Sequence, residues 1–223
     1  MKSNTARKLS HRFRSKRDAI LRGAIDQVAG KTEGFRILDL GGRSDYWKRV
    51  GYEFLAEKGA QIIILNLVES EFGVDKEAPE GLFEFAVGDA TGTDYPDNSF
   101  DFVHSNSVIE HVGMWGDMHN FAKETRRLAP AYYIQTPNFW FPVDPHFYSI
   151  PMNHWLPHPM RAFLMRTFNL ATAGKAKDLG QAYEFCDSNA LLTKAQMRYL
   201  FPDAQMKYER MALLTKSIIA LKT

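Results

Sequence analysis

The sequence predicts an α/β fold built on a parallel β-sheet, and three observations support this prediction. Between Phe35 and Val112, short apolar runs alternate with segments of helical periodicity. Each apolar run ends in a glycine turn or in polar residues, the usual position of ligand-binding groups in such sheets. The 223 residues are 45% hydrophobic and 24% charged, which suits one globular domain with a sizeable core.

The first half of the chain predicts one strand–helix–strand unit. Residues 36–40 form a short apolar run before Gly41-Gly42, as expected for a buried strand that enters a tight turn. Residues 44–58 carry large apolar side chains at three- and four-residue intervals, which predicts a helix that Gly59 ends. Residues 61–67 form a continuous run rich in β-branched side chains, which predicts a strand buried on both faces. Together these segments make one βαβ unit.

The middle of the chain continues the alternation. We expect, in order, a strand at 83–87, a strand at 100–104, a helix at 118–128 and a strand at 132–135 that Pro137-Asn138 stops. Residues 138–187 then change character, because they hold most of the prolines and many aromatic, Met and His residues. We interpret this region as a lid-like helical insertion over the ligand site.

The C-terminal part predicts a helix and a hairpin. Thr193 and Gln196 have the spacing of a capping box, which predicts a helix that ends near Phe201-Pro202. Two strands follow, near 206–211 and 217–221, and a short turn separates them. We therefore expect an antiparallel hairpin at the edge of the sheet.

Residues 1–30 predict a basic amphipathic helix before a single domain at 31–223. Residues 1–22 carry a charge of +7, from eight basic residues and the single acid Asp18, while the remainder carries −5. The basic residues are Lys2, Arg7, Lys8, Arg12, Arg14, Lys16, Arg17 and Arg22. Such a helix can contact an anionic surface: RNA, a membrane or an acidic substrate. The alternative is a solvated helix that packs over the entrance of the fold.

Other composition signals narrow the class of protein. Cys186 is the single cysteine, so an intramolecular disulfide is impossible, and we expect a buried structural thiol rather than a nucleophile. We find no secretory leader and no apolar run near the roughly 20 residues that cross a bilayer. We therefore expect a soluble, cytoplasmic protein.

The turn after the first strand indicates the kind of ligand. A glycine turn lets a ligand approach bare backbone, and the following helix presents unpaired N–H groups. The dinucleotide motif G-x-G-x-x-G is absent, since Gly41-Gly42 is followed by Arg43-Ser44-Asp45. Asp39 beside the turn would repel a phosphate and accept a hydrogen bond from an ammonium group. The turn therefore favours an amino-acid-bearing nucleoside.

With these features, residues 35–137 resemble the class I S-adenosylmethionine-dependent methyltransferases, most of all the small-molecule type that includes the quinone-biosynthesis enzymes. The terminal hairpin is also similar to that family. The resemblance implies a Rossmann-like, mostly parallel seven-stranded sheet with an antiparallel last strand and helices on both faces. It further implies S-adenosylmethionine as cofactor and S-adenosylhomocysteine as product.

The resemblance also implies a set of cofactor-binding residues at the strand ends. The residues that match the family's motifs are Asp39, Gly41, Gly42, Asn66, Asp89, Ala90, Ser105 and Asn106. Arg43 and Asp45 stand where the family has its second and third glycines, and Asn66 stands where it has the acid that binds the ribose hydroxyls. Glu69 is a possible substitute for that acid.

Candidate catalytic residues follow the fourth strand and lie in the insertion. The run 99–112, with its Glu110-His111-Val112 ending, resembles the family's loop behind the cofactor. His111 and Glu110 could act as base or substrate ligand, or they could cap the next helix. Asp144 and His146 could form a carboxylate-oriented imidazole, or could hold a proline-rich loop together.

Substrate contacts are expected from the aromatic part of the insertion. Trp140, Phe141 and His154 are the candidates, within a run that also contains Phe139, Phe147, Tyr148 and Trp155. The alternative is that these rings form the core of the insertion. We expect no metal site, because His146, His154 and His158 lack ligand spacing on one regular element.

The sequence thus favours a methyltransferase that acts on a small molecule: a sugar, a lipid-linked acceptor or a quinone-like acceptor. The basic N-terminal helix supports an alternative, methylation of RNA or protein. The altered glycine motif supports another, a degenerate methyltransferase fold that only binds. The acceptor, the methylated atom and the oligomeric state stay open at this stage.

Overall fold

A computed structural model describes residues 4–30, 34–147, 150–170 and 174–223, with side chains from residue 14 onward. The elements are α1 (Asn4–Ala29), β1 (Arg36–Leu40), α2 (Ser44–Val50), α3 (Tyr52–Glu57), β2 (Gln61–Asn66), η1 (Glu69–Glu71), β3 (Phe83–Val87), β4 (Phe102–Asn106), η2 (Ile109–His111), α4 (Trp115–Leu128), β5 (Ala131–Pro137), η3 (Asn153–Trp155), α5 (His158–Thr167), α6 (Leu179–Asp187), α7 (Lys194–Leu200), β6 (Gln205–Met211) and β7 (Leu214–Lys222).

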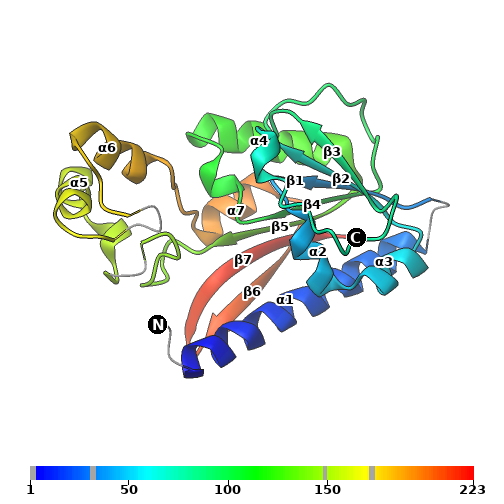
Figure 1. Cartoon of the computed structure of the whole chain (residues 1–223), viewed down its shortest axis with the longest axis horizontal. Coiled ribbons are helices and arrows are strands. Elements are labelled where there is room, and N and C mark those ends of the chain that lie inside the picture. The colour runs from blue at the N-terminus through cyan, green and yellow to red at the C-terminus, as the bar shows by residue number, and fades with distance from the viewer. Residues whose placement is uncertain (1–3, 31–33, 148–149, 171–173) are drawn as a thin grey trace.

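The strands form one seven-stranded sheet in the order β3-β2-β1-β4-β5-β7-β6 (Figure 1). Strand β7 pairs antiparallel with both β5 and β6, while the other neighbouring pairs are parallel. The predicted sheet, with its antiparallel last strand and terminal hairpin, is therefore confirmed. The order of the strands turns back at β1, and β1 and β4 are the neighbours there, which is where open α/β sheets bind ligands.

Helices cover both faces of the sheet, as expected. Alternate side chains of each strand point to opposite faces, so Ile37 joins one core cluster and Leu38 the other. Helices α4 and α7 contribute Phe121 and Met197 to the cluster of Leu38, and α1 and α2 contribute Ile25 and Trp47 to the cluster of Ile37. The central strands β1, β2, β4 and β5 are buried on both faces, which explains their nearly continuous apolar sequences.

The predicted helix at 44–58 is two helices, α2 and α3, that meet at Gly51. Gly51 has φ 106°, a left-handed conformation that side chains disfavour. Arg22 of α1 donates a hydrogen bond to the carbonyl of Val50, at 2.6 Å. The break is therefore stabilised by a residue distant in sequence, which local periodicity does not contain.

Several elements differ from the predicted bounds. Helix α4 begins at Trp115 rather than at 118, and β7 spans 214–222 rather than 217–221. Strand β4 spans 102–106 rather than 100–104, because Asp101 accepts a hydrogen bond from the backbone N–H of Arg36 at 2.8 Å just before the strand. Strand β5 spans 131–137 and includes Pro137, because the N–H of the next residue, Asn138, donates to Lys216 on β7 at 3.0 Å.

The N-terminal helix packs along the sheet rather than over an entrance. Leu21 and Ile25 are fully buried in the α1 contact with the sheet, and Arg22 bonds to Val50 as described above. Arg17 donates to Gln135 at 2.9 Å and lies 3.6 Å from Glu209. Two of the basic residues therefore bind within the fold, while the side chains before residue 14 lie outside the described part.

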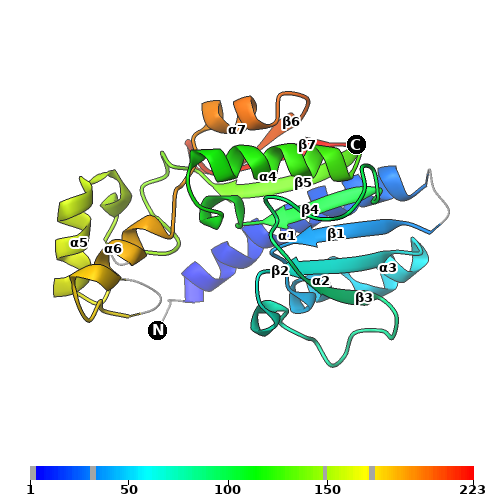
Figure 2. The same cartoon turned by 90° about the horizontal axis from the view of Figure 1, so that it is seen from above.

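The insertion between β5 and α7 has a small core of its own. Helices α5 and α6 lie beyond the carboxyl ends of the parallel strands, to the left in Figure 2. Phe147, Met165 and Cys186 are buried in this separate cluster. Cys186 is thus a buried thiol whose pKa is raised by burial, and the candidate Tyr148 lies outside the described residues.

Two smaller predictions can be compared with the structure. The capping box of α7 is present, since Thr193 and Gln196 exchange side-chain and backbone hydrogen bonds. Among the described residues, no helix combines the length and the apolar character that a membrane crossing requires.

The loop between β3 and β4 is fixed by Glu124 of α4. The carboxylate of Glu124 accepts hydrogen bonds from the backbone N–H and the hydroxyl of Thr93, at 2.8 and 2.7 Å. Arg127 donates to the same carboxylate at 2.6 and 2.8 Å. Burial acts to raise the pKa of Glu124, but the bonds from Arg127 and Thr93 outweigh it and lower the pKa to about 2. This network positions the loop that starts at Gly88-Asp89.

Replacing Ile25 with alanine should lower the free energy of unfolding by about 2–4 kcal/mol, because its side chain is fully buried between α1 and the sheet. Gln27 is exposed on the same helix, and Gln27→Ala should change the free energy by less than about 0.5 kcal/mol. Denaturant unfolding measures both values. Equal, small effects would mean that α1 does not dock on the sheet.

Glu124→Gln should lower the free energy of unfolding by about 1–3 kcal/mol at pH 7, because charge-assisted bonds are lost. The folded pKa lies below the ordinary value of 4.5, so this stabilisation exists above that pH and disappears as the pH falls toward 2. In urea unfolding, the difference between the free energies of unfolding of the wild type and Glu124→Gln should therefore shrink from pH 7 to pH 3. A gap that stays constant with pH contradicts the role of the charge, and exposed Glu57→Gln serves as the control.

Candidate functional site

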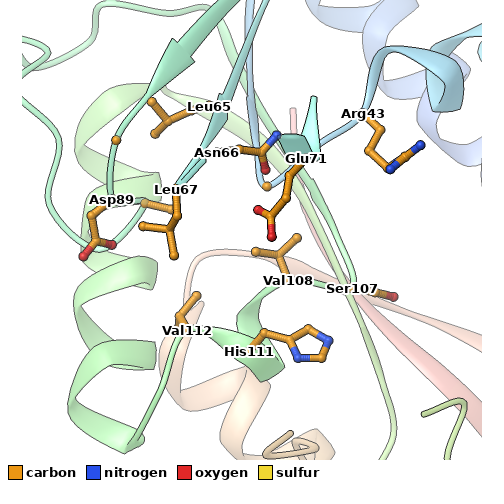
Figure 3. A pocket seen from close by; sticks show the side chains of 13 residues that line it. Arg43, Leu65, Asn66, Leu67, Glu71, Asp89, Ser107, Val108, His111 and Val112 are labelled. Carbon is orange, nitrogen blue, oxygen red and sulfur yellow. The ribbon is translucent and has the colours of Figure 1, made fainter. Parts of the chain in front are cut away.

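A cavity of about 520 Å³ lies at the carboxyl ends of β1, β2, β3 and β4 (Figure 3). Its wall consists of Gly41, Arg43, Leu65, Asn66, Leu67, Glu71, Gly88, Asp89, Ala90, Ser107, Val108, His111 and Val112. Small-molecule sites typically have volumes of about 300–1,000 Å³. The ends of the four strands thus meet around a cavity that fits a nucleoside-sized ligand.

The turn after β1 comes so close to the loop after β4 that only glycine fits. Gly41 has φ 69°, and a Cβ atom there would lie 2.6 Å from both methyl carbons of Val108. The N–H of Gly41 also donates to the carbonyl of Leu65 on β2, at 2.8 Å. Gly41 therefore joins three strand ends with bare backbone at the cavity wall.

Asp39 lies behind this turn, outside the cavity wall. Its carboxylate is fully buried and accepts hydrogen bonds from Trp47 Nε1 and His104 Nδ1, both at 2.7 Å. A Cβ atom on Gly42 would lie 1.7 Å from this carboxylate, so Gly42 lets the turn pass over it. The structure places Asp39 and Gly42 as supports of the turn, while a contact between Asp39 and a ligand amine stays a prediction.

Asn66, Asp89 and Ala90 line the cavity, as the sequence predicts. Asn66 Nδ2 donates to the carbonyl of Gly42 at 2.8 Å, which ties the end of β2 to the turn after β1. Asp89 accepts two hydrogen bonds from Thr91, both at 2.8 Å, which close the turn after β3. Asn66 and Asp89 thus shape the backbone around the cavity and also border it.

Two charged residues line the cavity that the sequence analysis did not assign. Glu71 on η1 points its carboxylate toward the middle of the cavity in Figure 3, whereas Glu69, the suggested substitute, is not in the wall. Arg43 is paired with Asp45 at 3.0 Å. The two charged residues that stand where the family has glycines therefore form an ion pair at the rim of the cavity. A search for acids within five residues of the β2 end would have included Glu71.

The residues after β4 that line the cavity come slightly later in the chain than the predicted Ser105 and Asn106. Ser105 is buried and donates to the carbonyl of Leu40 at 2.9 Å, and Asn106 accepts from Arg17 at 3.3 Å. Neither residue is in the cavity wall, which Ser107 and Val108 form instead. The two-residue offset of β4 noted above accounts for this shift.

The four predicted catalytic residues lie close together, and His111 is the one of them in the wall of this cavity. His111 Nε2 and His146 Nε2 are 3.1 Å apart, and His146 Nδ1 lies 2.9 Å from Asp144. Glu110 is buried directly behind His111 and accepts a hydrogen bond from the Thr136 hydroxyl at 2.9 Å. Glu110 and His111 form the short turn η2 before α4 begins, so they do not cap that helix.

Burial sets the protonation of this group. Burial raises the pKa of Glu110 to about 7, against the smaller opposite effect of the Thr136 hydrogen bond. Burial also lowers the pKa of His111. For Asp144, burial acts to raise the pKa, but the hydrogen bonds from His146 outweigh it and keep the pKa low. Near pH 7 the group therefore combines an ionised carboxylate, a neutral imidazole and a carboxyl that is close to its midpoint.

A second cavity, of about 730 Å³, lies between the insertion and the start of α4. It begins at Gly113, directly after Val112 of the first cavity, and Trp115 and Phe139 supply aromatic surface. His154 lines it, and His154 Nε2 donates to the carbonyl of Phe139 at 2.8 Å. The residues that line this second cavity therefore begin directly after those that line the first, at the place where a ligand site under the insertion is predicted.

The other predicted substrate residues lie elsewhere. Trp140 is 61% exposed and stands against Trp155, with ring centroids 6.1 Å apart, outside the wall of this cavity. Phe141 is buried, at 5% exposure. His158 lines the second cavity and lies 2.8 Å from Asp187, so it does not join His146. His154 thus lines the second cavity, whereas Trp140 lines a separate cavity of about 520 Å³ together with Asn138 and Leu214.

Comparison with known proteins agrees with this architecture. A family model described as "Methyltransferase domain" matches residues 50–130. Two structures of phosphoethanolamine N-methyltransferase 2 from Haemonchus contortus are similar in fold. The complex with S-adenosyl-L-methionine has TM-score 0.52 and 18% identity, and the complex with phosphomonomethylethanolamine and S-adenosylhomocysteine has TM-score 0.51 and 19% identity.

Each of these matches covers 84% of this chain but only 38% of the neighbour, so the chain spans well under half the length of those proteins. No curated protein matches the sequence. The family model and the strand order agree with each other and with the resemblance that the motifs carry. On this basis the chain has the Rossmann-like fold of these methyltransferases, and residues 50–130 match the methyltransferase domain family.

Proposed function

We propose that this protein binds S-adenosylmethionine in the 520 Å³ cavity and methylates a small molecule held in the 730 Å³ cavity beside it. The observation that carries the proposal is the close approach at Gly41, where a Cβ would be 2.6 Å from Val108. Such a backbone-lined wall lets a ligand contact N–H groups at the start of α2. The residues present therefore fit an amino-acid-bearing nucleoside.

Four side chains are proposed to hold the cofactor. Asp89 and Ala90 border the turn expected to contact the adenine, and Asp89 can accept from an exocyclic amine. Asn66 and Glu71 border the expected ribose position, and Glu71 supplies the negative charge that Asn66 lacks. Glu71 thus replaces Glu69 as the proposed partner of the ribose hydroxyls.

When bound, S-adenosylmethionine supplies an electrophilic methyl group on a sulfonium. The protein's own task is to align the acceptor and exclude water, and alignment of reactants contributes roughly 7–11 kcal/mol. His111 is the residue of the predicted catalytic set that lines the cofactor cavity, and Glu110 lies behind it. These are the two side chains that we propose as proton acceptors if the methyl acceptor is a hydroxyl or an amine.

The second cavity supports a small acceptor with an aromatic or apolar body. Trp115 and Phe139 offer ring surfaces, and His154 Nδ1 is buried with no hydrogen-bond partner in the described part of the chain, so it is available to orient a polar group. The Haemonchus contortus neighbour binds phosphomonomethylethanolamine, which is also a small molecule. These features support the small-molecule class and leave the acceptor's identity to experiment.

Glu71→Gln should weaken S-adenosylhomocysteine binding about tenfold, because a charge-assisted hydrogen bond becomes a neutral one, a change of about 1.4 kcal/mol. Glu69→Gln is the matched control on the same turn: Glu69 is equally exposed but outside the cavity wall, so it should have no effect. Isothermal titration calorimetry measures both.

Two results would count against the cofactor site. Equal effects of the two glutamate variants would move the ribose contact away from Glu71. No heat from the wild-type protein at millimolar S-adenosylhomocysteine would favour the degenerate, binding-only alternative.

Trp115→Ala should reduce kcat/KM for the methylated acceptor about tenfold, since a ring surface at the acceptor is lost, whereas Trp140→Ala should have little effect. Both residues are partly exposed, at 43% and 61%, so neither change should unfold the protein. S-adenosylhomocysteine release with a panel of phenolic, sugar and amine acceptors measures the rates. The reverse order of effects would place the acceptor on the Trp140 side of the insertion.

A further inference from the structure

The imidazole rings of His111 and His146 face each other in an unusual way. Their Nε2 atoms are 3.1 Å apart, and the ring planes are inclined by 88°. The carboxylate of Glu110 also reaches this point: one ligand atom from each of the three residues lies within 4.8 Å of the other two. Three groups able to bind a cation thus converge from η2 and from the insertion.

The outer hydrogen bonds fix which nitrogen of each ring carries the proton. His111 Nδ1 lies 2.7 Å from the carbonyl oxygen of Ser188, and His146 Nδ1 lies 2.9 Å from Asp144 Oδ1. A carbonyl or a carboxylate oxygen only accepts, so each Nδ1 must donate. In two neutral rings both Nε2 atoms then present lone pairs to one another, which is repulsive unless a positive charge lies between them.

The carboxylate of Glu110 is also incompletely satisfied in this cluster. The side chain is 1% exposed, and Oε2 accepts from Thr136. The other oxygen, Oε1, is buried and has no hydrogen-bond partner among the described residues. A buried carboxylate oxygen without a partner is costly, and a bound cation removes that cost.

We propose that Glu110, His111 and His146 bind a divalent transition-metal ion, for which Zn²⁺ is the best fit. Two imidazole nitrogens and one carboxylate oxygen are the protein ligands of open, three-ligand zinc sites. Tetrahedral Zn–N bonds of about 2.0–2.1 Å place two nitrogens about 3.3 Å apart, close to the observed separation. Asp144 and Ser188 are then the outer partners that orient the two imidazoles, as in carboxylate–histidine–zinc arrangements.

The position of the site suggests its use. His111 also lines the 520 Å³ cavity, on the same turn as Val108 and Val112 in Figure 3. The ion's open coordination position would therefore be available to a hydroxyl or carboxylate oxygen of the methyl acceptor. This part of the inference rests on the proposed function, whereas metal binding itself does not.

The test is zinc binding by the full-length chain after removal of metals with a chelator. The wild-type protein as purified should contain one Zn²⁺ per chain by elemental analysis, and the chelator-treated protein should bind one Zn²⁺ per chain in a calorimetric titration. Co²⁺ in place of Zn²⁺ should give visible absorption bands of a nitrogen- and oxygen-ligated ion. His146→Asn and Glu110→Gln should each weaken zinc binding at least about 100-fold, and Asp144→Asn about 10- to 100-fold.

His158→Asn is the matched control. His158 is also a histidine of the insertion that pairs with a carboxylate, 2.8 Å from Asp187, but it lies outside the proposed ligand set. Zinc affinity should be unchanged in this variant. Circular dichroism confirms folding, and Glu110→Gln, which keeps the shape of the side chain, decides the matter if His146→Asn does not fold.

Failure to retain zinc by folded wild-type protein would overturn the proposal and would leave a shared proton as the charge between the rings. Equal zinc affinity in the wild type, His146→Asn and Glu110→Gln would overturn it as well. S-adenosylhomocysteine is titrated into the same samples. Cofactor binding without zinc binding would contradict only the proposed metal site. Zinc binding without cofactor binding would contradict only the proposed function.

Discussion

The close approach between the turn after β1 and the loop after β4 is the constraint on which the site depends. At Gly41 there is no room for a side chain beside Val108, and at Gly42 none beside the Asp39 carboxylate. Asp39 is in turn held by Trp47 and His104 inside the core. The backbone at the cavity wall is therefore fixed from both sides, by van der Waals contact above and by buried hydrogen bonds below. A cavity wall of this kind loses little entropy when a ligand binds, because it is already ordered.

A second set of contacts joins the insertion to the cofactor cavity at η2. The side chain of His111 bonds to the carbonyl of Ser188, and the carbonyl of Glu110 accepts from the N–H of Ala190 at 2.8 Å. The segment that leaves α6 thus returns directly to the turn that lines the cavity. These two hydrogen bonds connect the turn at the first cavity directly to the segment that lines the second.

The sequence predicts the sheet well because its strands are buried on both faces and therefore read as unbroken apolar runs. It also predicts the glycine turn and the Asn66, Asp89 and Ala90 positions, since each directly follows a strand. What it misses depends on contacts between distant segments. The break at Gly51 is held by Arg22, and the convergence of Glu110 with His146 joins residues from η2 and the insertion, which no spacing on one element reveals. The bonds of the Asp39 carboxylate to Trp47 and His104 also join separate segments, and its contact with a ligand stays a prediction.

The separate core of the insertion has a consequence for how such a protein diversifies. Phe147, Met165 and Cys186 pack among themselves and not with the clusters under the sheet. Replacing these residues would reshape the acceptor side while leaving the sheet's packing intact. Under the proposed function, selection for new methyl acceptors can therefore act mainly on the packing of the insertion, while the packing of the sheet stays the same.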